Sequence, residues 1–237
     1  MNYLHPKTRI IQILLTAATP FEVLPLAEWL QKNCTPKEAG VFEKNNLRIV
    51  TLTTGVGVAS TCWQLGAFFA RLRPDLALNA GIPGAFDRNL DLGAVLNVTT
   101  ERFGDLGVEE ADGRFTDLFE LGLAGADEQP FSNGVLRNPD GGRFSFLPEV
   151  EGITVNKVHG WQPAIEAIRA KYPNAQVESM EGAAFFYACL LANIPFLEIR
   201  SISNYVEPRN REAWNLPLAI ENLNKTLIGM LDTFANT

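Results

Sequence analysis

The segment Val177-Glu178-Ser179-Met180-Glu181-Gly182-Ala183-Ala184 places a short strand directly before a helix. Residues 185–191 continue with apolar side chains at helical spacing, so Glu181 is expected beside the first helical turn. A second segment, Ile199-Arg200-Ser201-Ile202-Ser203-Asn204, has the pattern of a buried strand that ends in polar residues. Ligands of open α/β sheets bind outside the carboxyl ends of the strands. We therefore expect the Glu181 carboxylate and the Asn204 carboxamide to face one crevice.

Three units of strand, turn and helix precede these segments. Residues 10–15 form an apolar, β-branched run typical of a buried parallel strand, and residues 47–53 and 74–86 begin the next two units. Strands that alternate with helices in this way predict an α/β fold with a mostly parallel or mixed sheet and helices on both faces.

The remainder of the chain fits the same fold. Residues 95–100 and 153–155 are predicted strands, and residues 161–171 and 214–234 are predicted helices, the last with one apolar stripe. Residues 112–148 are rich in Gly, Pro and Asn and are predicted to form loops. Because no linker or repeat interrupts the pattern, we expect one domain over residues 1–237.

Composition limits the classes of partner. The net charge is −7, whereas a surface that reads phosphates needs clustered Lys and Arg, so nucleic acid is not expected as a partner. The apolar run at residues 10–18 is too short to cross a bilayer, and residues 1–9 lack the apolar core of a signal peptide. We expect a cytoplasmic protein that binds a small molecule and no membrane.

The cysteines do not suggest a disulfide framework or a metal site. Cys34, Cys62 and Cys189 are widely spaced, and His5 and His159 are the only histidines. This spacing matches neither a zinc motif nor a set of paired cysteines. We expect reduced cysteines that pack as small apolar residues.

Glu22 lies in the turn after the first predicted strand. Thr19 and Pro20 are typical of the N-cap and the first position of a helix, so Glu22 falls in the first helical turn. A carboxylate at this position interacts favourably with the helix dipole. The same position lies at the carboxyl end of a strand, where a ligand would bind. Position alone leaves both roles open.

The order of these motifs resembles the nucleoside phosphorylase and nucleosidase superfamily, whose members carry a Met-Glu pair for the ribose and a Ser-Asp pair for the purine. Met180-Glu181 matches the first pair, and Ser203-Asn204 stands where the second is expected. Gly55-Val56-Gly57 and residues 79–84 match the family's Gly-Val-Gly and Asn-x-Gly-x-x-Gly turns. The resemblance implies a three-layer αβα fold with a central mixed, mostly parallel twisted sheet, in a homo-oligomer.

The resemblance also implies a role for each matched residue. Glu22 corresponds to the catalytic acid or base, Asn204 to the catalytic residue at the leaving purine, and Met180 and Glu181 to the ribose site. The family's base-stacking Phe is absent from residues 156–160, where Val158 is found. The other substrate contacts that it implies are Gly81, Ile82, Gly84, Val158 and Ser203.

These residue types suit cleavage of an N-ribosidic bond. A carboxylate at Glu181 can accept hydrogen bonds from the ribose hydroxyls while its charge faces a developing oxocarbenium ion. Glu22 suits a base that orients and deprotonates water. The superfamily's phosphorylases place an arginine in the loop after the first strand, and residues 16–21 contain none. We therefore expect hydrolysis of a purine nucleoside without a cofactor or a metal.

Asn204 bears on the choice of base. An Asn side chain offers two N–H donors and one acceptor, so both donors can face N7 and O6 of a 6-oxopurine, whereas the adenine amino group would meet a donor. Residues 204–214 resemble a hydrolase group whose substrate also carries a benzoate. Arg209 and Arg211 suit that carboxylate, and a solvated charged loop explains them equally well.

Three alternatives remain open from the sequence. Two are enzymes, a nucleosidase of the methylthioadenosine type and a purine nucleoside phosphorylase. The third is a catalytically silent purine-binding protein, suggested by the loss of the family's Asp. Retention of Glu22 and Glu181 argues against the silent protein.

Overall fold

The computed structural model describes residues 9–141 and 146–236 of the chain. The main sheet contains β1 (Ile11–Ala17), β2 (Thr35–Glu38), β3 (Val41–Lys44), β4 (Leu47–Thr53), β5 (Leu76–Gly81), β6 (Gly84–Ala85), β7 (Val95–Glu101), β10 (Leu136–Arg137), β11 (Glu149–Thr154), β12 (Val177–Ser179), β13 (Phe196–Ser201) and β14 (Asn204–Tyr205). The strands follow the order β14-β6-β12-β11-β7-β13-β5-β1-β4-β3-β2, and β10 pairs with β7. The central strands β13, β5, β1 and β4 are mutually parallel, and antiparallel pairs join β13 to β7 and β6 to β12.

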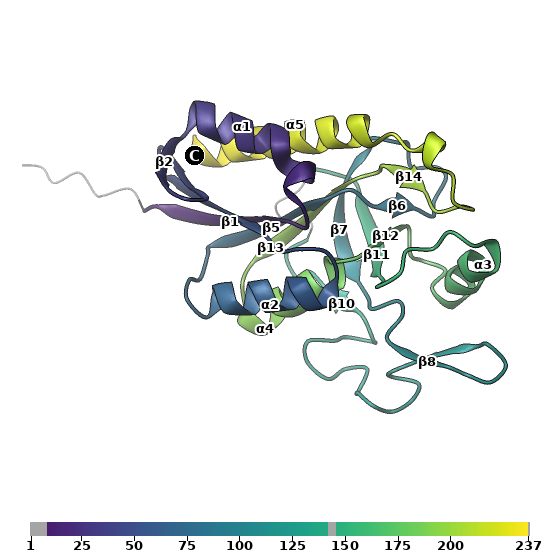
Figure 1. Cartoon of the computed structure of the whole chain (residues 1–237). Helices are drawn as coiled ribbons and strands as arrows, with labels where there is room; N and C mark the ends of the chain where they lie inside the picture. The colour runs from purple at the N-terminus through teal and green to yellow at the C-terminus, as the bar shows by residue number, and fades with distance from the viewer. Residues whose placement is uncertain (1–8, 142–145, 237) are drawn as a thin grey trace, which may run out of the picture.

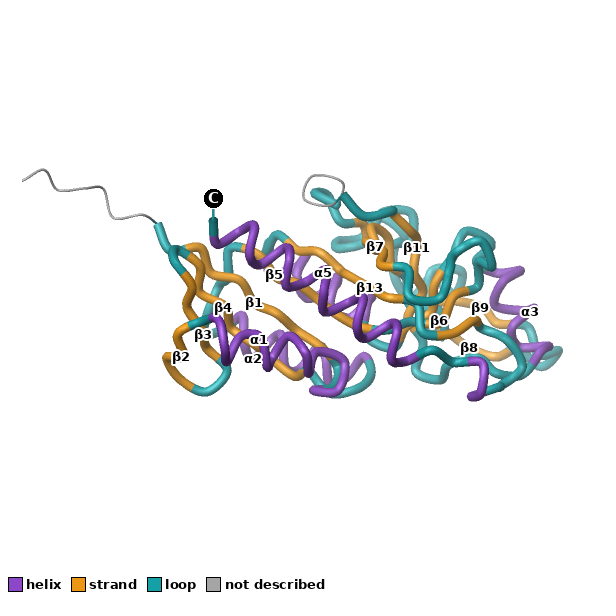
Figure 2. Tube along the Cα trace, turned by 90° about the horizontal axis from the view of Figure 1, so that it is seen from above, coloured by secondary structure: helices purple, strands orange, loops and turns teal. Residues whose placement is uncertain are grey.

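Helices cover both faces of this sheet. They are α1 (Leu24–Asn33), α2 (Val58–Phe69), α3 (Gln162–Lys171), α4 (Gly182–Ala192) and α5 (Leu216–Ala235), with 3-10 turns η1 (Pro20–Val23) and η2 (Arg211–Ala213). Figure 1 shows α1 and α5 together above the sheet and α2 and α4 together below it, which confirms the predicted three-layer αβα arrangement. Figure 2 shows α5 over the sheet, running along the direction of β5 and β13.

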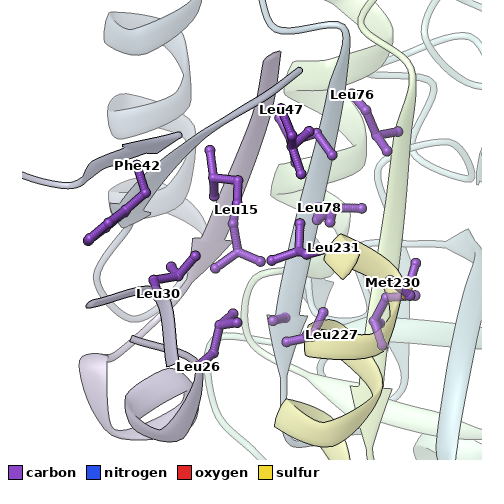
Figure 3. Close-up of a cluster of buried hydrophobic side chains, with 14 of the residues drawn as sticks. Leu15, Leu26, Leu30, Phe42, Leu47, Leu76, Leu78, Leu227, Met230 and Leu231 are labelled. Carbon is purple, nitrogen blue, oxygen red and sulfur yellow. The ribbon is translucent and has the colours of Figure 1, made fainter. Parts of the chain in front are cut away.

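Alternating side chains of the inner strands fill the two layers between sheet and helices. Leu15 and Leu78 pack with Leu26 of α1 and Leu227 of α5 (Figure 3), whereas the neighbouring Leu14 and Ala77 pack on the opposite side. The second layer is formed with aromatic residues Phe185, Phe186 and Phe196. This period of two explains why the inner strands are apolar along their whole length.

Several elements differ from the prediction. The helix expected directly after Thr19 begins as the 3-10 turn η1 and becomes α-helical at Leu24. The hairpin of β2 and β3 was not predicted, because Thr35–Glu38 is polar and lies at the exposed edge of the sheet. Residues 112–148, expected as loops, include β10 and β9 (Phe115–Asp117), which pairs with β8 (Gly107–Glu109).

Within residues 9–141 and 146–236, no helix is both long and apolar enough to span a membrane.

Candidate functional site

A cavity of about 280 Å³ lies where β5, β12 and β13 end. It is lined by residues from the ends of these strands, from β6 and β14, from the turns after β1 and β4, from the loop before α3 and from both sides of η2: Ala18, Thr19, Phe21, Glu22, Val56, Gly81, Ile82, Gly84, Val158, His159, Glu178, Ser179, Met180, Glu181, Arg200, Ser203, Asn204, Tyr205, Val206, Glu207, Arg209, Trp214 and Leu216. Almost all residues that the sequence singled out therefore meet in one cavity.

Glu22 is held on several sides. Its Oε2 accepts hydrogen bonds from the backbone N–H (2.9 Å) and the hydroxyl (3.1 Å) of Thr19, and its Oε1 accepts one from Ile82 N–H (3.3 Å). Its backbone carbonyl accepts from the buried side chain of Asn224 on α5 (2.9 Å). Glu22 is only 9% exposed but lines the cavity, so it serves as a helix-capping residue and also presents a carboxylate to a ligand.

Arg200 is the cation beside Glu22. It is 2% exposed, and it lines the cavity from the end of β13. A Cβ added at Gly81 would lie 2.8 Å from Arg200 Nη1 and 3.2 Å from Glu22 Oε1. The absence of a side chain at position 81 therefore allows the carboxylate and the guanidinium to approach the same point of the cavity.

Two buried carboxyl groups lie behind Arg200. Glu198 Oε1 is 3.2 Å from Arg200 Nη2, and Glu198 and Glu101 are both fully buried. Burial raises the pKa of Glu198 to about 7, against the opposing effect of Arg200. Burial and the nearby Glu198 raise the pKa of Glu101 as well. This cluster fixes Arg200 from behind and leaves its other side to the cavity.

Glu181 occupies the N-cap of α4, next to Met180. Its Oε1 accepts a hydrogen bond from Gly57 N–H (2.9 Å), in the turn that matches the family's Gly-Val-Gly motif. Burial raises the pKa of Glu181, and the Gly57 hydrogen bond and Arg200 oppose this rise. Both Met180 and Glu181 line the cavity, as the sequence predicted.

Asn204 and Ser203 line the cavity just beyond the end of β13. Asn204 Oδ1 accepts from the Ser203 hydroxyl (2.8 Å), and Asn204 Nδ2 donates to the Tyr205 carbonyl (2.9 Å). A Cβ at Gly84 would lie 3.1 Å from Asn204 Nδ2, so the amide faces the space above that glycine. One of the two N–H donors that the sequence assigned to the base is thus already used within the protein.

The two arginines after β14 are placed differently. Arg209 lines the cavity and stacks on Trp214, with its guanidinium carbon 5.3 Å from the ring centre. Arg211 begins η2, is exposed and does not line the cavity. Of the two arginines, the structure thus places Arg209 at the cavity and Arg211 on the exposed η2 turn beside it. Val158 does line the cavity, 40% exposed.

Sequence reasoning did not assign a role to Arg200, Glu178, His159 or Trp214. Charged residues inside a buried strand were the available signal for Arg200 and Glu178, since a buried charge needs a partner or a function. His159 and Trp214 lie in irregular segments whose position only the fold reveals. In the described part of the chain, no cluster of three or more His, Cys, Asp or Glu side chains is arranged to hold a metal ion.

Comparison with known proteins gives consistent results. The family model described as "Phosphorylase superfamily" matches residues 152–234. The chain is 32% identical over 179 residues to a futalosine hydrolase of Streptomyces coelicolor, covering 73% of this chain and 74% of that protein. It is 26% identical to a 5'-methylthioadenosine/S-adenosylhomocysteine nucleosidase of Glaesserella parasuis, covering 81% and 84%. The solved native futalosine hydrolase of Helicobacter pylori shares the fold, with a TM-score of 0.72, 16% identity, and coverage of 94% and 98%.

Proposed function

Because this chain belongs to the phosphorylase superfamily, with futalosine hydrolases among its relatives, we propose that it is a nucleosidase that hydrolyses the N-ribosidic bond of futalosine. The products are hypoxanthine and dehypoxanthine futalosine, in the futalosine route to menaquinone. The observation that carries the proposal is the convergence of Glu22, Glu181 and Asn204 on one cavity.

The ribose is assigned to Glu181 and Met180. With Oε1 fixed by Gly57 N–H, the Glu181 carboxylate retains acceptor capacity for the 2'- and 3'-hydroxyls of the sugar. Its negative charge lies in a partly desolvated cavity, where it stabilises positive charge that develops on the ribose. Met180 supplies an apolar wall for the sugar.

The attacking water is assigned to the space between Glu22 and Arg200. Glu22 accepts the proton of the water while the oxygen forms a bond to C1' of the ribose. The C1'–N9 bond breaks, its electron pair leaves with the purine, and the purine takes up a proton from solvent to become hypoxanthine, while Glu22 returns the proton it accepted to solvent. The Asn204 N–H that is not donated to Tyr205 then stabilises the departing base at N7.

The benzoate of futalosine is assigned to Arg209. Its stacking on Trp214 orients the guanidinium, and the aromatic ring offers an apolar surface beside it. Exposed apolar side chains, Phe21 at 57% and Val56 at 56%, also line the cavity. They support the further proposal of a homo-oligomer, in which a neighbouring copy covers this edge; light scattering after size-exclusion chromatography tests it.

Chromatographic detection of hypoxanthine released from futalosine in phosphate-free buffer tests the proposed function. Methylthioadenosine, S-adenosylhomocysteine and inosine are the comparison substrates, each with and without phosphate. Glu22→Gln is expected to lower turnover by roughly 10²–10⁴-fold, the typical contribution of a general base. Faster release of adenine from methylthioadenosine would instead assign the chain to the methylthioadenosine-type nucleosidases, which are also among its relatives.

A further inference from the structure

We propose that Glu178, held by His159, is the residue that selects a 6-oxopurine base, by accepting a hydrogen bond from N1–H of that base. The inference rests on the proposed function, because it assigns the purine to the part of the cavity around Gly84. It concerns a residue that the hydrolytic step itself does not use.

The strand register places Glu178 and Asn204 on either side of Gly84. Gly84 of β6 is the partner of Asn204 on β14 and also the partner of Glu178 on β12. Side chains at paired positions lie on one face of a sheet, and both residues line the cavity. The backbones of the two residues are therefore separated by about 10 Å, two strand spacings, and Gly84 between them adds no side chain of its own.

A purine edge matches this slot. N7, O6 and N1–H follow one another along one edge of a 6-oxopurine. With N7 at Asn204, N1–H is directed across β6 toward Glu178. The glycine lets Asn204 and Val206 lie close to β6, since a Cβ there would approach Asn204 Nδ2 to 3.1 Å and Val206 Cγ2 to 2.9 Å, and the base edge meets the cavity side of these two side chains.

Glu178 is fixed as an acceptor. Its Oε1 accepts a hydrogen bond from the backbone N–H of His159 (2.9 Å), and its Oε2 is hydrogen-bonded to Nδ1 of the His159 ring. Glu178 is only 3% exposed. A carboxylate has about four acceptor positions, so two remain for a ligand after these two hydrogen bonds. Because His159 prevents the carboxylate from turning away, it keeps an acceptor directed into the cavity.

Asn204 cannot make this selection by itself. Its Oδ1 and one N–H are engaged by Ser203 and Tyr205, which leaves one donor for the base. N7 is an acceptor in hypoxanthine and in adenine, so a single donor at N7 serves both. N1 differs, since it is a donor in hypoxanthine and an acceptor in adenine. A fixed acceptor opposite N1 therefore favours hypoxanthine and opposes adenine.

Calorimetric titration of the full-length protein with hypoxanthine, 1-methylhypoxanthine and adenine tests the proposal without requiring turnover. Glu178→Gln should weaken the binding of hypoxanthine by roughly 10- to 100-fold, the range for one hydrogen bond to a charged group. It should leave 1-methylhypoxanthine, which lacks N1–H, within about twofold of the wild-type affinity. Adenine should bind no more weakly than before, so the preference for hypoxanthine falls.

The wild-type protein supplies an independent arm, in case the variant does not fold. It should bind hypoxanthine at least tenfold more tightly than 1-methylhypoxanthine. The control is Glu151→Gln on the adjacent strand β11, a half-buried carboxylate paired with Arg102 outside the cavity; it should change none of the three affinities.

If Glu178→Gln weakened the binding of hypoxanthine and of 1-methylhypoxanthine equally, the proposal would be overturned, because Glu178 would then only position His159. Wild-type protein that binds the two bases equally would overturn it as well. Hypoxanthine binding with this pattern but no futalosine hydrolysis would contradict the proposed function alone.

Discussion

Gly81→Ala should disable the site through a single methyl group. The added Cβ would lie 2.8 Å from Arg200 Nη1 and 3.2 Å from both Arg200 Cζ and Glu22 Oε1, where an ordinary contact is at least 3.4 Å. Arg200 cannot retreat easily, because it is 2% exposed and paired with Glu198. Glu22 is likewise held by Thr19 and Ile82.

The expected loss follows from these distances. The guanidinium must move by about 0.6 Å to restore an ordinary contact, which separates the two groups assigned to the attacking water. Misplacement on the order of 1 Å costs roughly 10²-fold in rate. We therefore expect kcat to fall about 10- to 100-fold, with a loss of about 1–3 kcal/mol in the free energy of unfolding from overpacking.

The assay combines steady-state hydrolysis of futalosine with urea unfolding. Gly66→Ala in α2 is the matched control, since a Cβ there meets no atom within 4 Å and should leave kcat unchanged. In a Glu22→Gln background, Gly81→Ala should have much less effect on kcat, because the base it displaces is already absent. A Gly81→Ala enzyme with wild-type kcat and stability would refute the assigned positions of Glu22 and Arg200.

Three further predictions concern the other groups of the site. Glu181→Ala should lower kcat/KM by at least 10²-fold on the ribonucleoside, and a 2'-deoxy analogue should lose less; equal losses would contradict the contact with the hydroxyls. Asn204→Ala should slow release of hypoxanthine and adenine by similar factors, roughly 10²-fold, as measured with inosine and adenosine; a loss confined to one base would contradict the N7 assignment. The free energy of unfolding should fall as pH rises from about 4.5 to about 7, because folded Glu198 retains a proton that the unfolded chain releases. Glu198→Gln should flatten this dependence in urea titrations, and an unchanged pH profile would refute the assignment.

The sequence predicted the layers of the fold because its inner strands are apolar on both faces. β4 has the predicted bounds, residues 47–53, and the three-layer arrangement is confirmed. The β2–β3 hairpin was missed because its outer strand lacks an apolar face. Its outer strand is entirely exposed and contains Pro36, so neither alternation nor β-propensity marks it as a strand.

The site was predictable where a motif stands at a strand end, as at Met180-Glu181 and Ser203-Asn204. It was not predictable where contacts join segments that are distant in the sequence. The pairing of Glu178 with His159 joins β12 to the loop before α3, and the register through Gly84 brings Glu178 opposite Asn204. Only the sheet topology, with β6 inserted between β14 and β12, reveals that relation.

The charges around the cavity bear on the choice of water over phosphate. Glu22, Glu178 and Glu181 present carboxyl groups to the space in which the nucleophile, sugar and base are placed. The cation beside Glu22, Arg200, already faces the carboxyl groups of Glu22 and Glu181, so it has limited capacity to compensate a phosphate dianion. Such a dianion would approach like charges in a partly desolvated cavity, where repulsion is stronger than in water. A neutral water molecule carries no such cost and finds in Glu22 an acceptor for its proton, so the same carboxylates that suit the ribose and the base also favour hydrolysis over phosphorolysis.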